Sequence, residues 1–157
     1  MLKPGAIAPA FTLPDQHAAP TSLAELLRRG PLILYFYPAD FTPGCTREAC
    51  FIRDVHAELA GAGLTVAGVS PQSSESHSRF AQRHSLPFTL LADTEKTVAR
   101  LYGVIAPLGL GVRRATFLIG TDAVIRDALR ADFSIARHEE FFRRAVAARS
   151  EPVARGP

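Results

Sequence analysis

The chain alternates between short apolar runs and longer segments in which apolar residues recur every three or four positions. Apolar and aromatic runs typical of buried strands lie at residues 31–38, 64–70, 88–93, 113–120 and 123–130. Segments that predict helices lie at residues 42–63, 73–85, 94–103 and 136–149. In the first of these, Phe51, Val55 and Leu59 follow an i, i+4, i+8 spacing, and Gly61 and Gly63 end the helix.

The order of these segments predicts the fold class. Strands and helices alternate through the first three pairs, which is typical of an α/β sheet with helices on both faces. Thr121 and Asp122 separate the last two strands as a hairpin, so we expect a mixed sheet. A chain of 157 residues suits one domain, which we place at 1–150, with 151–157 as a frayed C-terminal tail.

Composition and charge limit the classes of binding partner and the cellular compartment that we expect. The chain is 47% hydrophobic and 21% charged, with a formal net charge of +3, as in ordinary globular proteins. No run of five or six like charges favours nucleic-acid binding, and no apolar stretch is long enough to span a membrane. The first residues lack the apolar core of a signal peptide. We therefore expect a cytoplasmic protein, in which thiols stay reduced and a structural disulfide is not expected.

Both cysteines lie in one stretch, PADFTPGCTREAC, at residues 38–50. Thr42 precedes Pro43, and this pair predicts a helix start, with Thr42 as the N-cap and Pro43 in the first helical position. Cys45 then lies third in the helix. The unpaired N–H groups and the positive end of the helix dipole favour a thiolate there, and the thiolate is the nucleophilic form of cysteine.

Cys50 does not pair with Cys45 in a regular helix. Five helical residues turn the two side chains about 140° apart and separate their Cα atoms by roughly 8–9 Å, beyond the limit of about 7 Å for a disulfide. The helical wheel centres the core face between Phe51, Ile52, Val55 and Leu59, and it places Cys50 toward the polar side. No histidine lies at a ligand spacing from the two thiols, so we expect no metal, and we expect surface or packing roles for all five histidines.

The same stretch resembles a known family. Residues 38–45 are similar to the peroxiredoxin motif Pro-x-x-x-Thr-x-x-Cys, and residues 46–50 resemble the Q-type branch, also called bacterioferritin comigratory proteins. The opening Gly5-x-x-Ala-Pro-x-Phe-x-Leu-x-Asp15 and the run Arg114-Ala-Thr-Phe-Leu-Ile are similar to peroxiredoxin segments as well. The resemblance covers roughly residues 2–148. The chain departs from the family pattern at Ala39, Ile105 and the turn 121–123.

The resemblance implies a thioredoxin-like fold and a thiol peroxidase without a cofactor. It implies that Cys45 is the peroxidatic nucleophile and Cys50 the resolving cysteine. Arg114, Thr42 and Pro38 match the active-site positions, whereas the neighbouring Arg113 points to the other face of its strand, toward solvent. Glu48 either orients an arginine or is a surface charge.

The resemblance also implies a reaction cycle, which determines the substrates and the reductant that we expect. Hydrogen peroxide and organic hydroperoxides are the expected substrates. The oxidised pair forms an intramolecular disulfide, which thioredoxin or a similar dithiol reduces. By analogy with most Q-type members, we expect a monomer.

Two alternatives start from the same cysteines. A thioredoxin-like disulfide oxidoreductase would reduce protein disulfides without consuming peroxide, but the chain lacks Cys-x-x-Cys and a proline before the run Thr116-Phe-Leu-Ile. A redox sensor that signals through a Cys45–Cys50 disulfide would oxidise slowly and would need a protein partner. The rate of the peroxide step distinguishes the sensor from the peroxidase.

Overall fold

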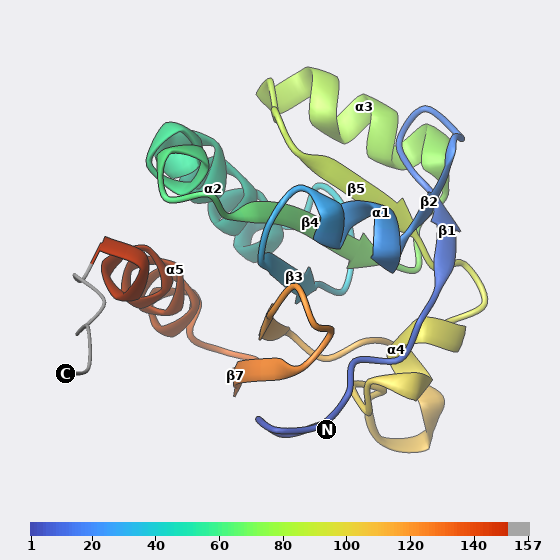
Figure 1. Ribbon diagram of the computed structural model, residues 1–157. Coiled ribbons are helices and arrows are strands. Elements are labelled where there is room, and N and C mark those ends of the chain that lie inside the picture. Colours follow the sequence, from blue (N-terminus) through green and yellow to red (C-terminus); the bar gives the residue numbers. More distant parts are fainter. Residues whose placement is uncertain (151–157) are drawn as a thin grey trace, which may run out of the picture.

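A five-stranded mixed sheet organises the chain in the computed structural model, which describes residues 1–150 (Figure 1). The strand order is β5-β4-β3-β6-β7; β3, β4 and β5 run parallel, and β6 and β7 are antiparallel to their neighbours. The strands are β3 (Leu32–Phe36), β4 (Thr65–Ser70), β5 (Thr89–Ala92), β6 (Ala115–Ile119) and β7 (Ile125–Arg130). The predicted mixed sheet of a thioredoxin-like α/β fold is confirmed.

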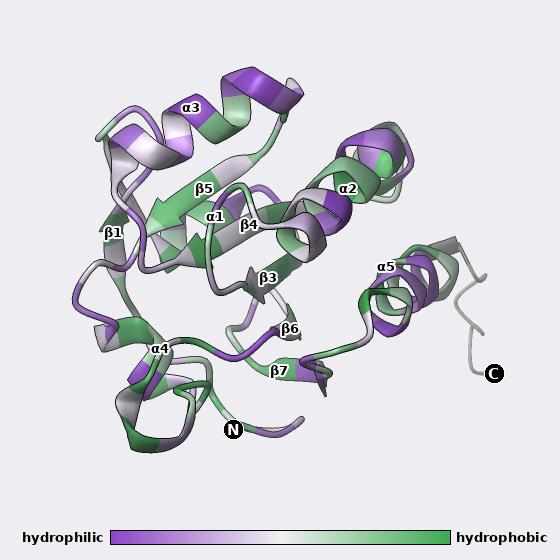
Figure 2. Cartoon of the chain, turned by 180° about the vertical axis from the view of Figure 1, so that it is seen from behind, coloured by the Kyte–Doolittle hydropathy of each residue, from purple (hydrophilic) through white to green (hydrophobic). Residues whose placement is uncertain are grey.

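Helices cover both faces of this sheet. The helices are α1 (Leu23–Arg28), α2 (Pro43–Gly61), α3 (Ser74–His84), α4 (Thr97–Leu101) and α5 (Ile135–Ser150). One apolar cluster joins α1 and α4 to the sheet, and a second joins α2, α3 and α5 to its other face. Helices α2 and α5 lie side by side, and the central strands are mostly green in the hydropathy colouring, whereas α3 carries several purple segments (Figure 2).

The central strand β3 is buried along its whole length. Leu32, Leu34 and Phe36 face the first cluster, and Ile33 and Tyr35 face the second, because successive side chains in a strand alternate between the faces. This burial on both faces explains why the strand reads as an unbroken apolar run. The chain leaves β3 at its carboxyl end and passes directly into the loop that starts α2.

The N-terminal segment contains elements that the hydropathy pattern does not predict. Strands β1 (Thr12–Pro14) and β2 (Pro20–Ser22) form a separate antiparallel pair, and the short helix α1 follows at once. The strands are only three residues long and carry prolines, so they show no alternating apolar pattern. A 3-10 turn (Pro107–Gly109) was likewise not predicted.

The other predicted elements exist; most are shorter than predicted, whereas α5 is one residue longer at each end. The helix expected at 94–103 is confined to α4, because Asp93 accepts hydrogen bonds from the N–H groups of Val98 and Ala99 and starts the helix later. The strands expected at 113–120 and 123–130 each begin two residues later than predicted. The frayed tail expected at 151–157 lies outside the described residues.

The buried face of α2 agrees with the predicted one in part. Ile52 and Leu59 are buried as predicted, whereas Phe51 and Val55 are only partly buried. The first half of the helix buries three residues that the apolar spacing does not mark, namely Cys45, Glu48 and Ala49. The buried face thus includes the thiol.

Gly68 makes room for the aromatic layer beneath α2. It pairs with Tyr35 across β3 and β4, and a β-carbon at this position would lie 2.8–2.9 Å from the Tyr35 ring. The Tyr35 ring stacks on Tyr37 at a centroid distance of 5.4 Å, in the layer that supports Cys45. The absence of a side chain at residue 68 therefore sets the position of Tyr35.

We predict that Gly68→Ala lowers the free energy of unfolding by about 1–3 kcal/mol, because an added methyl group overpacks the site against Tyr35. Gly61→Ala is the control, since no atom lies within 4 Å of its added carbon, and we expect it to stabilise α2 by about 0.5–1 kcal/mol. Urea unfolding of both variants measures the two effects. Equal stability of the two variants would contradict this role of Gly68.

Candidate active site

Cys45 lies in the first turn of α2, as predicted. Thr42 has an extended N-cap backbone (φ −76°, ψ 150°), and Pro43 takes the first helical position. The Thr42 hydroxyl does not cap the helix but donates a hydrogen bond to the carbonyl of Ala39 at 3.2 Å. The expected N-cap position is therefore confirmed, and the hydroxyl oxygen keeps its lone pairs for another donor.

The start of α2 carries little local stabilisation. It has no side-chain cap and no acidic residue in the first turn. The N–H of Thr46 donates to the Thr42 carbonyl at 2.8 Å. The N–H groups of Gly44 and Cys45 precede this first hydrogen bond of the helix, so they have no acceptor within it. These N–H groups point their partial positive charge toward the side of the helix end where Cys45 lies.

Arg114 contacts Cys45 although the two residues are 69 positions apart in the sequence. Its Nη2 donates to Cys45 Sγ at 3.1 Å, and its Nη1 donates to Glu48 Oε1 at 2.8 Å. Cys45 and Glu48 are each 1% exposed, and Arg114 is 6% exposed. Gly44 allows this approach, because a β-carbon there would lie 3.3 Å from Arg114 Nη2. The guanidinium therefore places a buried positive charge and a hydrogen-bond donor against the Cys45 sulfur.

Glu48 is a buried partner of Arg114. The alternative of a surface charge is wrong, because the side chain is 1% exposed. Burial raises the pKa of Glu48 to about 7, although the charge and hydrogen bond of Arg114 act to lower it. This carboxyl therefore gains and loses a proton near neutral pH.

Several residues around this pair were not predicted from the sequence. Asp132 accepts a hydrogen bond from the Arg114 N–H at 3.1 Å, and His138 Nδ1 lies 3.8 Å from Glu48 Oε2. Burial, and then the charge of Arg114, lower the pKa of His138. The neutral ring donates from Nε2 to the Ala131 carbonyl at 2.9 Å and accepts at Nδ1 from the Thr116 hydroxyl at 2.8 Å. Thr116 belongs to β6, His138 to the first turn of α5, and Asp132 to the loop between β7 and α5; no motif in the sequence marks them.

Hydrogen-bonding capacity remains inside the site. Within residues 1–150, the buried atoms Tyr35 Oη, Glu48 Oε2 and Arg114 Nε make no hydrogen bond to another protein group. Arg114 Nε is a donor, Glu48 Oε2 is an acceptor when it is ionised, and the tyrosine hydroxyl is both. The site therefore retains both donor and acceptor capacity close to the sulfur.

The remaining predicted residues lie around this centre. Cys50 is half-buried, and α2 runs unbroken from residue 43 to residue 61, so both thiols are free. Pro38 is exposed just after β3. Arg113 is only partly solvent-facing, because its side chain is 25% exposed and pairs with Asp132 at 3.4 Å. The structure thus brings Cys45, Glu48 and Arg114 into direct contact and places Thr42 three residues before the thiol.

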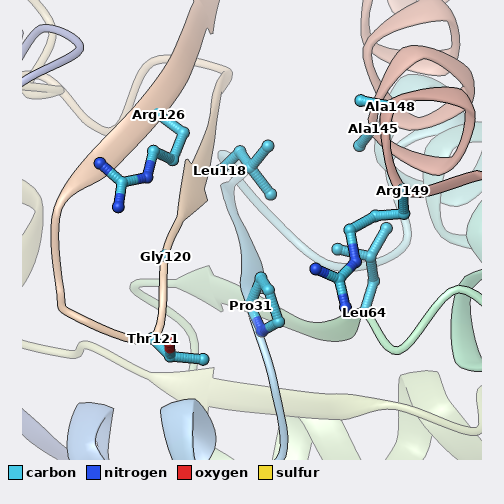
Figure 3. A pocket seen from close by; sticks show the side chains of 9 residues that line it. All are labelled: Pro31, Leu64, Leu118, Gly120, Thr121, Arg126, Ala145, Ala148 and Arg149. Carbon is cyan, nitrogen blue, oxygen red and sulfur yellow. The ribbon is translucent and has the colours of Figure 1, made fainter. Parts of the chain in front are cut away.

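Figure 3 shows a pocket that is separate from this site. It lies at the opposite end of β3, where Pro31 precedes the strand, with Gly120 after β6 and Arg149 near the end of α5. Among residues 1–150, no three side chains gather as metal ligands. No helix in this part of the chain is both long enough and apolar enough to cross a membrane.

Comparisons with known proteins bear on the family of the chain. The model of the AhpC/TSA family matches residues 4–128. Peroxiredoxin Q, chloroplastic, from Sedum lineare is 41% identical over 135 residues, which cover 85% of this chain and 72% of that protein. The crystal structure of peroxidoxin BcpB from Mycobacterium tuberculosis superposes with a TM-score of 0.88 at 37% identity and covers 94% of this chain and 98% of that one.

A further solved structure carries a description of activity. The bacterioferritin comigratory protein of Xanthomonas campestris, described as having alkyl peroxide reduction activity, superposes with a TM-score of 0.83 at 29% identity. It covers 96% of this chain and 98% of that one. The chain therefore belongs to the AhpC/TSA family and is a peroxidase of the branch that contains peroxiredoxin Q and the bacterioferritin comigratory proteins.

Proposed function

We propose that this peroxidase reduces hydrogen peroxide and organic hydroperoxides through a sulfenic acid on Cys45, which Cys50 resolves. The observation that carries the proposal is the 3.1 Å hydrogen bond from Arg114 Nη2 to the buried Cys45 sulfur at a helix N-terminus. The Xanthomonas campestris relative, with its alkyl peroxide reduction activity, supports organic hydroperoxides as substrates of this chain. The first step converts the Cys45 thiolate and ROOH into Cys45–SOH and RO⁻.

Charge moves from sulfur to the leaving oxygen during this step. Arg114 and the N–H groups of Gly44 and Cys45 lie where they stabilise that negative charge, so they lower the barrier more than they stabilise the ground state. The Thr42 hydroxyl donates to Ala39 and accepts a hydrogen bond from the hydroperoxide O–H, which orients the peroxide. Pro38, which adds no N–H, forms part of the pocket wall.

The second step joins the two cysteines. Cys50 attacks the Cys45 sulfenic acid, the S–S bond forms and water leaves. This requires the first turns of α2 to unwind, because a regular helix keeps Cα atoms five residues apart roughly 8–9 Å from each other. The uncapped start of α2 favours such unwinding, since a missing side-chain cap leaves a helix weaker by about 1 kcal/mol.

Reduction of this disulfide completes the cycle. A thioredoxin-type dithiol exchanges with the Cys45–Cys50 disulfide and returns both thiols. We place the enzyme in the cytoplasm, where such a reductant keeps thiols reduced, and we propose that it works as a monomer with residues 1–150 as its single domain.

The intact mass of the reduced protein after one equivalent of hydrogen peroxide tests the two cysteine roles. We expect the wild type to lose two hydrogens, Cys50→Ser to gain one oxygen, and Cys45→Ser to stay unchanged. A wild type that stays reduced for minutes contradicts a peroxidase cycle through these cysteines. Oxygen addition to Cys45→Ser at the wild-type rate would show that a residue other than Cys45 is the nucleophile.

Arg114→Lys tests the guanidinium at the sulfur. Lysine keeps the charge, but its single ammonium nitrogen cannot occupy the positions of both Nη1 and Nη2, so we expect kcat/KM for peroxide to fall about 10²–10³-fold, as when one oxyanion donor is lost. The adjacent Arg113→Gln is the control, with an expected change below about fivefold, because a partly exposed ion pair contributes about 0–1 kcal/mol. Equal losses in the two variants would argue against a specific role of Arg114.

The raised pKa of Glu48 predicts a pH-dependent stability. The folded-state pKa of about 7 exceeds the ordinary value of 4.5, so this residue's contribution is complete below pH 4.5 and is lost as the pH rises through about 7. Relative to Glu48→Gln, we expect the wild type to lose up to about 3 kcal/mol of unfolding free energy between pH 5 and pH 8. Urea unfolding at both pH values, repeated in a Cys45→Ser background to remove the thiol titration, measures the loss. Parallel pH curves would contradict it.

A further inference from the structure

A second buried cluster lies beside the loop that leads into α2. The Asp40 side chain is fully buried, two residues before Thr42. Its carboxylate accepts hydrogen bonds from the Tyr37 hydroxyl, from the Ser76 hydroxyl and from His77 Nδ1, each at 2.7 Å. Both carboxylate oxygens therefore have hydrogen-bond partners, and two of these partners, Ser76 and His77, belong to α3. This cluster therefore ties the loop at residues 38–42 to α3.

His77 has a hydrogen-bond acceptor at each ring nitrogen. Nδ1 faces the Asp40 carboxylate at 2.7 Å, and Nε2 lies 3.1 Å from the Leu91 carbonyl. Burial acts to raise the pKa of Asp40, but the hydrogen bonds from His77, Tyr37 and Ser76 hold it below its usual value. The cluster is a buried histidine–carboxylate pair, in which removal of one partner leaves the other without its hydrogen bond.

The backbone next to Asp40 gives an independent observation. Phe41 has a φ of +64°, in the left-handed region that a bulky side chain rarely adopts. Such a conformation persists only where surrounding contacts determine it. The Asp40 hydrogen bonds fix the residue on one side, and the Phe41 ring packs edge-on against Phe80 of α3 at a centroid distance of 5.2 Å. The loop is thus held by α3 in a conformation that it would otherwise leave.

We propose that the Asp40–His77 pair positions the loop at residues 38–42, which leads into the helix of Cys45. By holding residues 38–42 on α3, it keeps Thr42 and the first turn of α2 in the folded arrangement in which Arg114 contacts the Cys45 sulfur. Neither Asp40 nor His77 touches the sulfur, so both act through the loop. This inference rests on the proposed function, because it assigns the folded helix start to the peroxide step and the unwound helix start to disulfide formation.

The two steps make opposite demands on this pair. Attack of the Cys45 thiolate on ROOH, which yields Cys45–SOH and RO⁻, needs the folded loop. Condensation of Cys45–SOH with the Cys50 thiol, which releases water, needs the helix start to unwind. A loosened pair therefore slows the first step and leaves the second unchanged or faster. A merely structural loss would not separate the steps in this way.

Two substitutions of His77 give a matched comparison. Both replace the imidazole ring with an amide, but the amide nitrogen of asparagine corresponds to Nδ1, which faces Asp40, and that of glutamine to Nε2, which faces Leu91. We expect His77→Gln to slow sulfenic acid formation about 10–100-fold and His77→Asn to react about tenfold or more faster than His77→Gln. Asp93→Asn is the control, because Asp93 is a buried carboxylate that caps α4 and makes no hydrogen bond to the loop.

Each step is measured by quenched flow with thiol alkylation and intact mass, since the chain has no tryptophan to report oxidation. A Cys50→Ser background isolates the peroxide step, and the appearance of the disulfide in the two-cysteine protein follows resolution. Amide exchange of the reduced variants over residues 40–46 should rise for His77→Gln and not for Asp93→Asn. If His77→Gln does not fold, Ser76→Ala removes one donor to Asp40 and should show the same separation of steps.

The outcomes separate this proposal from the peroxidase mechanism. Equal peroxide rates for His77→Gln, His77→Asn and the control, or equal slowing of both steps, overturn the positioning role while the wild-type cycle stands. A wild type that does not react with peroxide at Cys45 overturns the proposed function itself. The expected result is a slow peroxide step with an unimpaired resolution step in His77→Gln alone.

Discussion

The site depends on one buried cation that is shared by two partners. Arg114 contacts the Cys45 sulfur with one terminal nitrogen and Glu48 with the other, at 3.1 Å and 2.8 Å. Burial of a guanidinium is costly unless its donors are paired, and Glu48 supplies that pairing from the next turn of the same helix as the thiol. Because Glu48 gains a proton near neutral pH, the balance of charge around Arg114 changes with pH without movement of the backbone.

In the proposed cycle, the start of α2 must meet two requirements that conflict. It has to be ordered when peroxide reacts with Cys45 and has to unwind when the proposed Cys45–Cys50 disulfide forms. A well-capped helix start would satisfy only the first requirement, and here the Thr42 hydroxyl bonds to Ala39 in place of the helix. Order is instead supplied from outside the helix, by Arg114 and by the contacts of the preceding loop with α3. Contacts of this kind are lost together once the loop leaves, which makes the change switch-like.

The sequence predicts the sheet and the thiol better than it predicts the surroundings of the thiol. Apolar runs mark β3 and β4 because these strands are buried on both faces, and the pair Thr42-Pro43 marks the helix start because proline restricts the backbone. Glu48 could not be placed by the helical wheel, since a charged residue is assigned to the polar face unless its partner is known. That partner, Arg114, is 66 residues away, and only the resemblance to a family connects the two.

The two buried histidines show why residue type alone does not fix the role of a side chain. His77 has an acceptor at each ring nitrogen, the Asp40 carboxylate and the Leu91 carbonyl. His138 faces one carbonyl and a hydroxyl that can donate, beside the positive charge of Arg114, and is neutral. The sequence predicts only packing or surface roles for both, because no histidine lies at a ligand spacing from the two thiols. The hydrogen bonds of a buried histidine are set by its partners in space, so the sequence cannot supply them until the fold brings those partners together.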